Sequence, residues 1–141
     1  MAGNILIVDD SAIMRQMIKR TIQMAGLDVA GFYEAGNGIE GFAALARQKV
    51  DVVVLDINMP VMNGVQFLKR IHDDPRLRDV AVVIASTEGS ETRIQELLAC
   101  GARGYLRKPF HPEKLRDVLT PLLGAAQPAA SSPPGEASDA F

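Results

Sequence analysis

The sequence lacks the features of secreted and membrane-spanning proteins. Cys100 is the only cysteine among 141 residues, so neither an internal disulfide nor a thiolate metal cluster can form. No apolar run approaches the roughly 20 residues that a membrane-spanning helix needs. The N-terminal stretch MAGNILIVDD also reaches acidic residues too early for a secretory signal. We therefore expect a cytoplasmic protein that makes no contact with a membrane.

An excess of charge of one sign is also lacking. The chain has 15 Lys and Arg against 17 Asp and Glu, a formal net charge of −2. Both excess acids, Glu136 and Asp139, lie near the C-terminal end, so the rest of the chain is balanced. This balance argues against direct binding to nucleic acid.

The composition is that of one folded domain followed by a polar, low-complexity segment. Apolar residues make up 48% and charged residues 23%, as in ordinary globular proteins. After residue 123 the sequence GAAQPAASSPPGEASDAF has too few apolar side chains to offset the entropy lost on ordering. We predict a domain over residues 1–123 and a disordered tail over residues 124–141.

Short apolar runs alternate with segments of helical periodicity along the domain, which indicates repeated βα units. The runs predicted as strands are residues 5–8, 29–33, 52–55, 80–85 and 103–106. Three of them are continuously apolar, as expected of strands covered by helices on both faces.

Between and after these runs, apolar side chains recur at helical spacing, and we assign them to the core. They are Ile13, Met14, Met17, Ile18 and Ile22; Ile39, Phe42, Ala43 and Ala46; Phe67, Leu68 and Ile71; Ile94, Leu97 and Leu98; and Leu115, Val118, Leu119 and Leu122. Gly26 is expected to end the first helix. Five strands and five helices in alternation predict an α/β, flavodoxin-like doubly wound (βα)5 three-layer sandwich, with a parallel sheet of order 2-1-3-4-5.

Two adjacent carboxylates, Asp9 and Asp10, follow the first predicted strand in the stretch NILIVDDS. Like charges in contact disfavour each other's ionised form, so the pair needs a compensating partner. One interpretation is a helix N-cap at Asp10 or Ser11. The other is a site for a hard cation such as Mg²⁺ or Ca²⁺, which binds clustered carboxylates.

The other predicted strands also end in polar residues. In an open α/β sheet the ligand site lies beyond the carboxyl ends of the strands. The residues that the sequence places there are Asp9 and Asp10, Asp56, Ser86 and Thr87, and Lys108. We therefore expect these groups to meet at one edge of the sheet.

Their chemistry suits phosphoryl transfer. Three carboxylates with backbone oxygens form a Mg²⁺ site, and Lys108 and Ser86 can contact phosphoryl oxygens. Phosphoryl transfer needs in-line positioning and charge neutralisation, both of which this set supplies. Asp56 is the predicted nucleophile, since a carboxylate can form an acyl phosphate.

The motifs VDDS, LDINMPVMNG, AST and LRKPF, in this order and at these spacings, closely resemble the receiver domain of bacterial two-component response regulators over about residues 4–123. Among receivers the chain looks most like the CheY-type single-domain class. The resemblance implies that Asp56 accepts a phosphoryl group from a histidine kinase. It also implies Mg²⁺ held by Asp9, Asp10, Asp56 and the backbone carbonyl of Asn58. The chain would then be a signalling phosphoacceptor rather than an enzyme.

The resemblance also implies a conformational switch. Ser86 would move toward the phosphoryl group while Tyr105, the aromatic residue of the last strand, rotates inward. The alternative for Tyr105 is a half-buried strand residue with its hydroxyl at the surface. The face that reports the change would be the last strand, residues 103–106, with the helices on either side of it. The Lys108–Pro109 bond is expected to be cis.

Three further positions would adjust the reaction. Asn58 and Glu88 stand two residues after the acceptor and two after the hydroxyl residue, and both positions set the phosphoryl lifetime in the family. Their polar types predict a short-lived phosphorylated state of the chemotaxis type. Thr87 stands where the family has a small residue, so it is expected to narrow access to the site.

The implied partners are a histidine kinase, a downstream protein such as a motor, kinase or phosphorelay component, and a phosphatase, with the chain a monomer or weak dimer. One alternative is a haloacid-dehalogenase-type phosphohydrolase, but such enzymes need a general acid where Asn58 stands. A flavin mononucleotide carrier fits poorly, because three carboxylates would repel the phosphate and tryptophan is absent. A phosphorylation-independent binding module is the remaining alternative.

Overall fold

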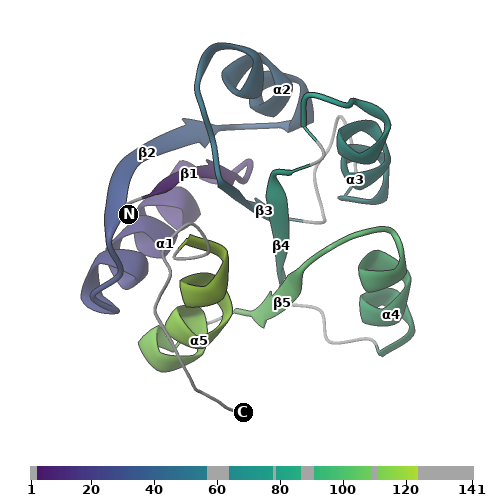
Figure 1. Cartoon of the computed structure of the whole chain (residues 1–141). Coiled ribbons are helices and arrows are strands. Elements are labelled where there is room, and N and C mark those ends of the chain that lie inside the picture. Colours follow the sequence, from purple (N-terminus) through teal and green to yellow (C-terminus); the bar gives the residue numbers. More distant parts are fainter. Residues whose placement is uncertain (1–2, 57–63, 78, 87–90, 109–110, 124–141) are drawn as a thin grey trace.

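The computed structural model describes residues 3–56, 64–77, 79–86, 91–108 and 111–123. Its five strands are all parallel and lie in the order β2-β1-β3-β4-β5 (Figure 1). They are β1 (Gly3–Val8), β2 (Val29–Ala35), β3 (Val52–Asp56), β4 (Ala81–Ser86) and β5 (Gly104–Arg107). Each overlaps a predicted run, so the predicted strands, their order and the fold class are confirmed.

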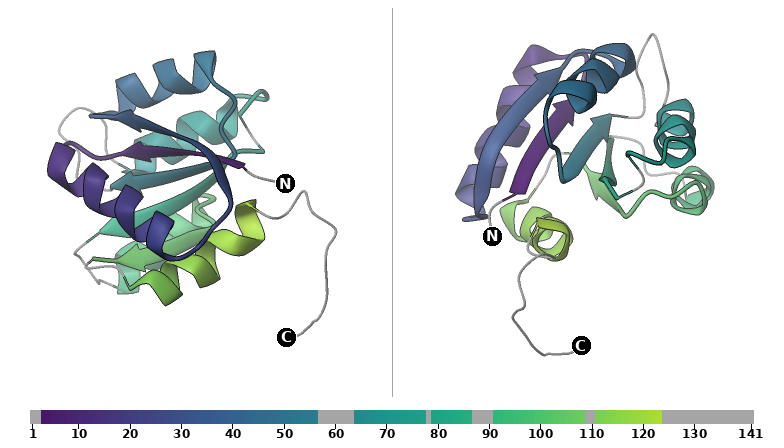
Figure 2. Two further views of the ribbon diagram at one scale, coloured as in Figure 1. Left: turned by 90° about the vertical axis from the view of Figure 1, so that its left-hand side faces the viewer. Right: turned by 45° about the horizontal axis from the view of Figure 1, so that its top comes forward.

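The described helices follow the strands in alternation. They are α1 (Ala12–Met24), α2 (Gly38–Arg47), α3 (Gly64–Asp73), α4 (Glu91–Ala99) and α5 (Pro112–Leu123). Helices α1 and α5 cover one face of the sheet, and α2, α3 and α4 cover the other (Figures 1 and 2). The structure therefore has the three layers that the sequence predicts.

Each strand supplies side chains to both layers, because successive residues of a strand point to opposite faces. In β1, Ile5 and Ile7 pack with Ile18 and Ile22 of α1. Leu6 and Val8 instead join the cluster on the α2–α4 side, which contains Phe67 and Leu97. The valine-rich strands β3 and β4 are buried along their whole length. Burial on both faces explains why these strands carry continuous apolar runs.

Local capping contacts set the ends of the first two helices. The Ser11 side chain accepts a hydrogen bond from the backbone N–H of Met14 and caps α1. The helix ends before Gly26, whose φ of 75° is accessible to glycine at little cost. At α2, Asn37 accepts from the N–H of Glu40, whose carboxylate accepts from the N–H of Gly36. This arrangement resembles a capping box, except that Glu40 accepts from the residue before the N-cap rather than from the N-cap itself.

Several predicted core residues lie at the surface instead. Ile13 and Met17 of α1 are 76% and 52% exposed, and Ile39 of α2 is 58% exposed. Ala43, Ala46 and Leu98 are also exposed. The core assignment was wrong for these six residues, because each lies on a side of its helix that is turned away from the sheet.

Helix α2 shows the physical reason most clearly. Its buried residues are Gly38, Gly41 and Leu45. A Cβ atom at Gly41 would lie 3.2 Å from Phe67 and 3.3 Å from Val8. The helix approaches the core so closely that its inward face uses glycine, which a search for hydrophobic periodicity passes over.

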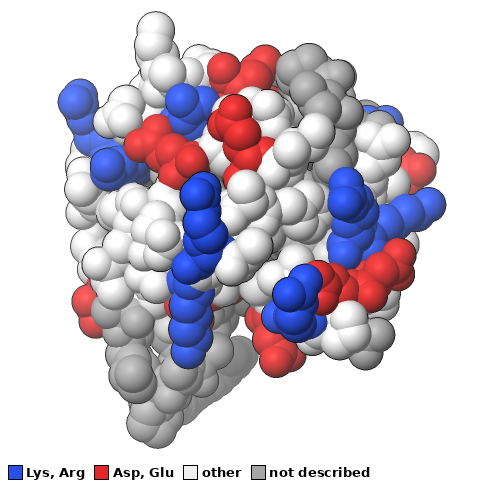
Figure 3. Space-filling model, turned by 90° about the horizontal axis from the view of Figure 1, so that it is seen from above, with Lys and Arg blue, Asp and Glu red and all other residues white. Residues whose placement is uncertain are grey.

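The surface agrees with the balanced composition. On the face seen in Figure 3, acidic and basic side chains are interspersed. No helix within the described residues is both long enough and apolar enough to cross a membrane. The predicted tail, residues 124–141, lies outside the described residues.

Candidate functional site

The parallel register brings polar residues from different strands to one edge of the sheet. Asp56, the last residue of β3, is paired with Ala85 of β4, and Ser86 is paired with Arg107 of β5. Asp9 follows β1 directly, and its N–H donates to the carbonyl of Ala35, the last residue of β2. The strands therefore end level with one another, as the sequence predicts.

Three carboxylates form a cluster at this edge. One carboxylate oxygen from each of Asp9, Asp10 and Asp56 lies within 4.8 Å of the other two. Asp9 is 2% exposed and Asp56 is 8% exposed, whereas Asp10 faces solvent. The cluster therefore has two buried members and one that is open to incoming ions.

Lys108 brings a positive charge to the cluster. Its Nζ lies 2.9 Å from Oδ2 of Asp9 and 3.7 Å from Oδ1 of Asp56, and its side chain is only 9% exposed. The backbone N–H of Lys108 donates to the carbonyl of Ser86 at 2.8 Å, which ties the end of β5 to the end of β4. Lys108 is thus held beside the cluster by its backbone as well as by its charge.

The structure answers the question raised by the adjacent acids. Ser11, not Asp10, is the N-cap of α1. The N–H of Ser11 donates to Oδ1 of Asp9 at 2.9 Å, so the Asp9 carboxylate is held next to the helix start. Ser11 therefore caps the helix, while the neighbouring Asp9 and Asp10 belong to the acidic cluster.

The donor set fits a hard divalent cation. Within the described residues, the three carboxylates of the cluster are in contact with one ammonium, that of Lys108. This leaves a negative excess on closely spaced oxygen ligands, which is the environment that Mg²⁺ and Ca²⁺ prefer. The acidic cluster can therefore bind a metal ion.

The predicted switch residues lie close to the same edge. Ser86 is completely buried at the end of β4. Tyr105 of β5 is half-buried, yet its hydroxyl is buried and has no hydrogen-bond partner within the part of the chain that the structure describes. The alternative that places this hydroxyl at the surface is therefore wrong for this conformation.

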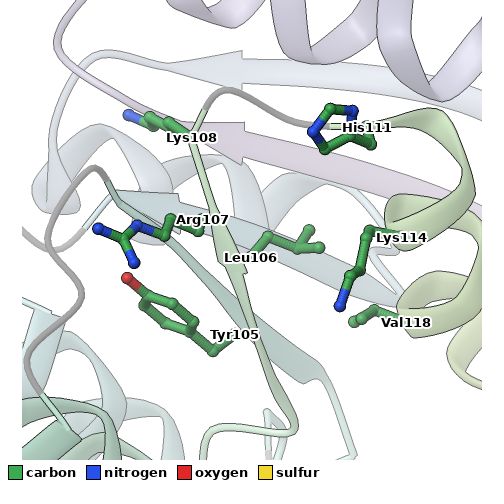
Figure 4. A pocket seen from close by; sticks show the side chains of 7 residues that line it. All are labelled: Tyr105, Leu106, Arg107, Lys108, His111, Lys114 and Val118. Atoms are coloured by element: carbon green, nitrogen blue, oxygen red, sulfur yellow. The ribbon is translucent and has the colours of Figure 1, made fainter.

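A hollow of about 450 Å³ runs along β5 and the start of α5 (Figure 4). It is lined by Tyr105, Leu106, Arg107, Lys108, His111, Lys114 and Val118. The side chains of Tyr105 and Arg107 point to the same side of β5 (Figure 4). The hollow thus connects Lys108, which contacts the acidic cluster, to the outer edge of the sheet.

Some predicted site residues cannot be placed. Asn58, Thr87, Glu88 and Pro109, with the predicted cis bond, lie outside the described residues. Sequence reasoning also missed Arg15, which contacts the site, and Glu34, which pairs with Arg15. Arg15 donates to the backbone carbonyl of Asp9 and pairs with Glu34 at 3.0 Å. The predicted second strand stopped before Glu34, so no pattern connected the two residues.

Comparison with known proteins decides the family. The family model described as "Response regulator receiver domain" matches residues 5–120. The chain belongs to this family. It is a receiver domain of a two-component system, which decides against the phosphohydrolase and flavin-carrier alternatives.

Several relatives of this receiver are chemotaxis proteins. The chemotaxis protein CheY1 of Helicobacter pylori is 35% identical over 121 residues, which cover 85% of this chain and 96% of that protein. CheY of Thermotoga maritima is 38% identical over 120 residues, covering 84% and 96%. The structure of Vibrio cholerae CheY4 matches with a TM-score of 0.76 and 36% identity, covering 87% of this chain and all of that one. The chain is therefore a CheY-like response regulator.

Proposed function

We propose that this receiver is switched by Mg²⁺-dependent phosphorylation of Asp56 by a histidine kinase. The observation that carries the proposal is the cluster of Asp9, Asp10 and Asp56, whose oxygens lie within 4.8 Å of one another beside Lys108. These carboxylates would hold Mg²⁺ together with the backbone carbonyl of Asn58, a ligand that follows from the family pattern. When bound, Mg²⁺ supplies neutralising charge for phosphoryl oxygens.

The residues of the chain have distinct roles in this reaction. An Asp56 carboxylate oxygen bonds to phosphorus while the bond from phosphorus to the kinase imidazole breaks. Lys108, 3.7 Å from Asp56, is placed to pair with a phosphoryl oxygen, and the Ser86 hydroxyl to donate to another. In this reaction the phosphoryl group is transferred to the chain itself and not to a separate substrate. The chain would therefore act as a phosphoacceptor and not as an enzyme.

We further propose that phosphorylation of Asp56 changes the conformation of β5 and so alters the surface that partner proteins bind. Ser86 would approach it and Tyr105 would shift behind Ser86, altering the face of α4, β5 and α5. Arg107 and Lys114 line the hollow on this face, which suits an acidic segment of a partner protein. The proposed partners are a histidine kinase, a downstream motor, kinase or phosphorelay protein, and a phosphatase.

The lifetime of the phosphorylated state would depend on Asn58 and Glu88, as in related chemotaxis receivers. Replacing Asn58 with a bulky apolar residue such as Leu is expected to lengthen this lifetime, and an unchanged decay rate would count against the assignment.

The proposed receiver domain covers residues 1–123, because the last described helix ends at Leu123. Its single cysteine, Cys100, agrees with the proposed cytoplasmic location.

Intact-mass spectrometry after incubation with acetyl phosphate tests the proposal. The native chain with Mg²⁺ is expected to gain one phosphoryl group. Asp56→Ala, and the native chain in EDTA, are expected to gain none. Asp73→Ala, which removes an exposed carboxylate of α3, is the matched control and should react normally. A native chain that stays unmodified with both acetyl phosphate and a histidine kinase would instead support a phosphorylation-independent binding module.

A further inference from the structure

Arg15 connects the acidic cluster to the edge strand of the sheet. Its guanidinium donates to the backbone carbonyl of Asp9, and its Nε lies 3.0 Å from Oε1 of Glu34 on β2. The Arg15 side chain is 18% exposed and that of Glu34 is 28% exposed, so solvent screens this pair only partly. A planar guanidinium holds two acceptors in fixed directions, which a lysine ammonium does not.

Glu34 in turn is held by helix α1. Its second oxygen, Oε2, accepts from Gln16 at 3.2 Å and lies 4.0 Å from Nζ of Lys19. Three side chains from consecutive turns of α1 therefore meet one carboxylate of β2. Gln16 and Lys19 therefore restrain the Glu34 carboxylate, which in turn restrains the Arg15 side chain that contacts Asp9.

Asp9 is held at each of its polar positions. Its N–H donates to Ala35, its carbonyl accepts from Arg15, its Oδ1 accepts from Ser11 and its Oδ2 accepts from Lys108. The carbonyl contact has a special consequence, because the six atoms of a peptide unit are coplanar. Fixing the carbonyl of Asp9 fixes the peptide unit that leads to Asp10. It therefore restrains the position of the Asp10 backbone, which carries the exposed carboxylate.

We propose that Arg15 is a positioning residue for the divalent-cation site and that Glu34 holds Arg15 in place. The inference rests on the proposed function, since it concerns the cation held by Asp9, Asp10 and Asp56. Without Arg15 the peptide between Asp9 and Asp10 loses one restraint, and the Asp10 carboxylate must be ordered when the cation binds. Hydrogen bonds just outside a ligand set commonly change metal affinity by about 10- to 100-fold.

The direction in which Mg²⁺ affinity changes when Arg15 is replaced distinguishes a positioning role from a purely electrostatic one. Arg15 carries a positive charge beside a cation site, and removing such a charge strengthens the attraction between the site and a cation. An Arg15 that acts only through its charge therefore predicts tighter Mg²⁺ binding in Arg15→Ala. An Arg15 that positions Asp9 and Asp10 predicts weaker binding.

Isothermal titration calorimetry with Mg²⁺ and the full chain measures this direction. Arg15→Ala is expected to raise the Kd about 10-fold or more, and Glu34→Gln by a smaller factor. Arg15→Lys keeps the charge but not the planar fork, so it should restore only part of the affinity. Arg20→Ala, which removes one exposed positive charge from the same helix, is the matched control and should bind Mg²⁺ as the native chain does or slightly more tightly.

Phosphorylation kinetics give a second readout. At limiting Mg²⁺ the reaction of Arg15→Ala with acetyl phosphate is expected to be slow, and saturating Mg²⁺ should restore most of the native rate. A folded Arg15→Ala with a Kd equal to or tighter than the native value would overturn the inference. If Arg15→Ala fails to fold, native Kd values in both Arg15→Lys and Glu34→Gln would overturn it. A native chain that binds no Mg²⁺ would refute the proposed function instead.

Discussion

Lys108 donates from Nζ to Oδ2 of Asp9, 2.9 Å away and 99 residues earlier in the chain. The same Nζ lies 3.7 Å from Asp56, so one ammonium contacts two of the three clustered carboxylates. A metal ion bound by these carboxylates would therefore share two of them with Lys108. The stability of the domain and its affinity for cations are therefore linked through this residue.

Replacing Lys108 with Ala is expected to make stability depend on Mg²⁺. Breaking a buried charge pair leaves the partner charge uncompensated, which costs about 3 kcal/mol or more. In EDTA the free energy of unfolding should fall by roughly this amount, whereas added Mg²⁺ should recover most of it. Urea unfolding in the two buffers measures the difference. An equal loss of stability with and without Mg²⁺ would contradict the linkage between Lys108 and the cation site.

Asp10→Asn is expected to change metal binding and stability in opposite directions. The substitution removes a ligand charge, so Mg²⁺ affinity should fall by about 10-fold or more. It also relieves repulsion between clustered carboxylates, so the variant should be as stable as the native chain, or more so, in EDTA. Thermal unfolding with increasing Mg²⁺ reports both quantities. A native-like upward shift of Tm with Mg²⁺ in Asp10→Asn would rule out a ligand role for Asp10.

Ser11→Ala tests the cap at the start of α1. The Ser11 side chain accepts from the N–H of Met14, and loss of such a cap costs about 1 kcal/mol. The N–H of Ser11 still donates to Asp9 in this variant, so Mg²⁺ affinity should change little. Ser11→Asp preserves a capping oxygen and should retain most of the stability. Equal stability of Ser11→Ala and the native chain in urea would show that the cap is not needed.

Tyr105→Phe is expected to leave the domain as stable as before or to stabilise it. The Tyr105 hydroxyl is buried without a hydrogen-bond partner in the described part of the chain, and an unsatisfied buried polar group costs about 1–3 kcal/mol. Removing the hydroxyl while keeping the ring removes that penalty. A variant less stable than the native chain by more than about 1 kcal/mol would mean that the hydroxyl has a favourable interaction in solution.

The strands and the convergence of the site could be predicted because both depend on simple rules. Residues 52–55 and 80–85 are continuously apolar, as expected of strands buried on both faces. The carboxyl ends of parallel strands meet at one edge, so Asp9, Asp56 and Lys108 had to come together once the order was known.

The inward faces of the helices were harder to predict. In α1, residues Met14, Ile18 and Ile22 pack toward the core, while Ile13 and Met17 form a second apolar stripe beside them that remains exposed. Hydrophobicity alone does not distinguish adjacent stripes, because each recurs at helical spacing. Only the packing of α1 on the sheet selects one of them.

The contacts of Arg15 could not be predicted for a related reason. A side chain that donates to a backbone carbonyl leaves no mark in the sequence, because every residue has such a carbonyl. The pairing of Arg15 with Glu34 depends on where β2 ends relative to α1, and the boundary of that strand was placed two residues short. Such contacts follow from tertiary geometry rather than from local patterns.

Mapping the modified residue shows whether Asp56 is the phosphoacceptor. The native chain would be treated with acetyl phosphate and Mg²⁺, reduced with borohydride, which converts an aspartyl phosphate to homoserine, and then digested for tandem mass spectrometry. Phosphorylation of Asp56 predicts homoserine at position 56 and unmodified acids at positions 9 and 10, with no conversion in EDTA. Conversion at Asp9 or Asp10 in place of Asp56, or equal conversion in EDTA, would contradict it.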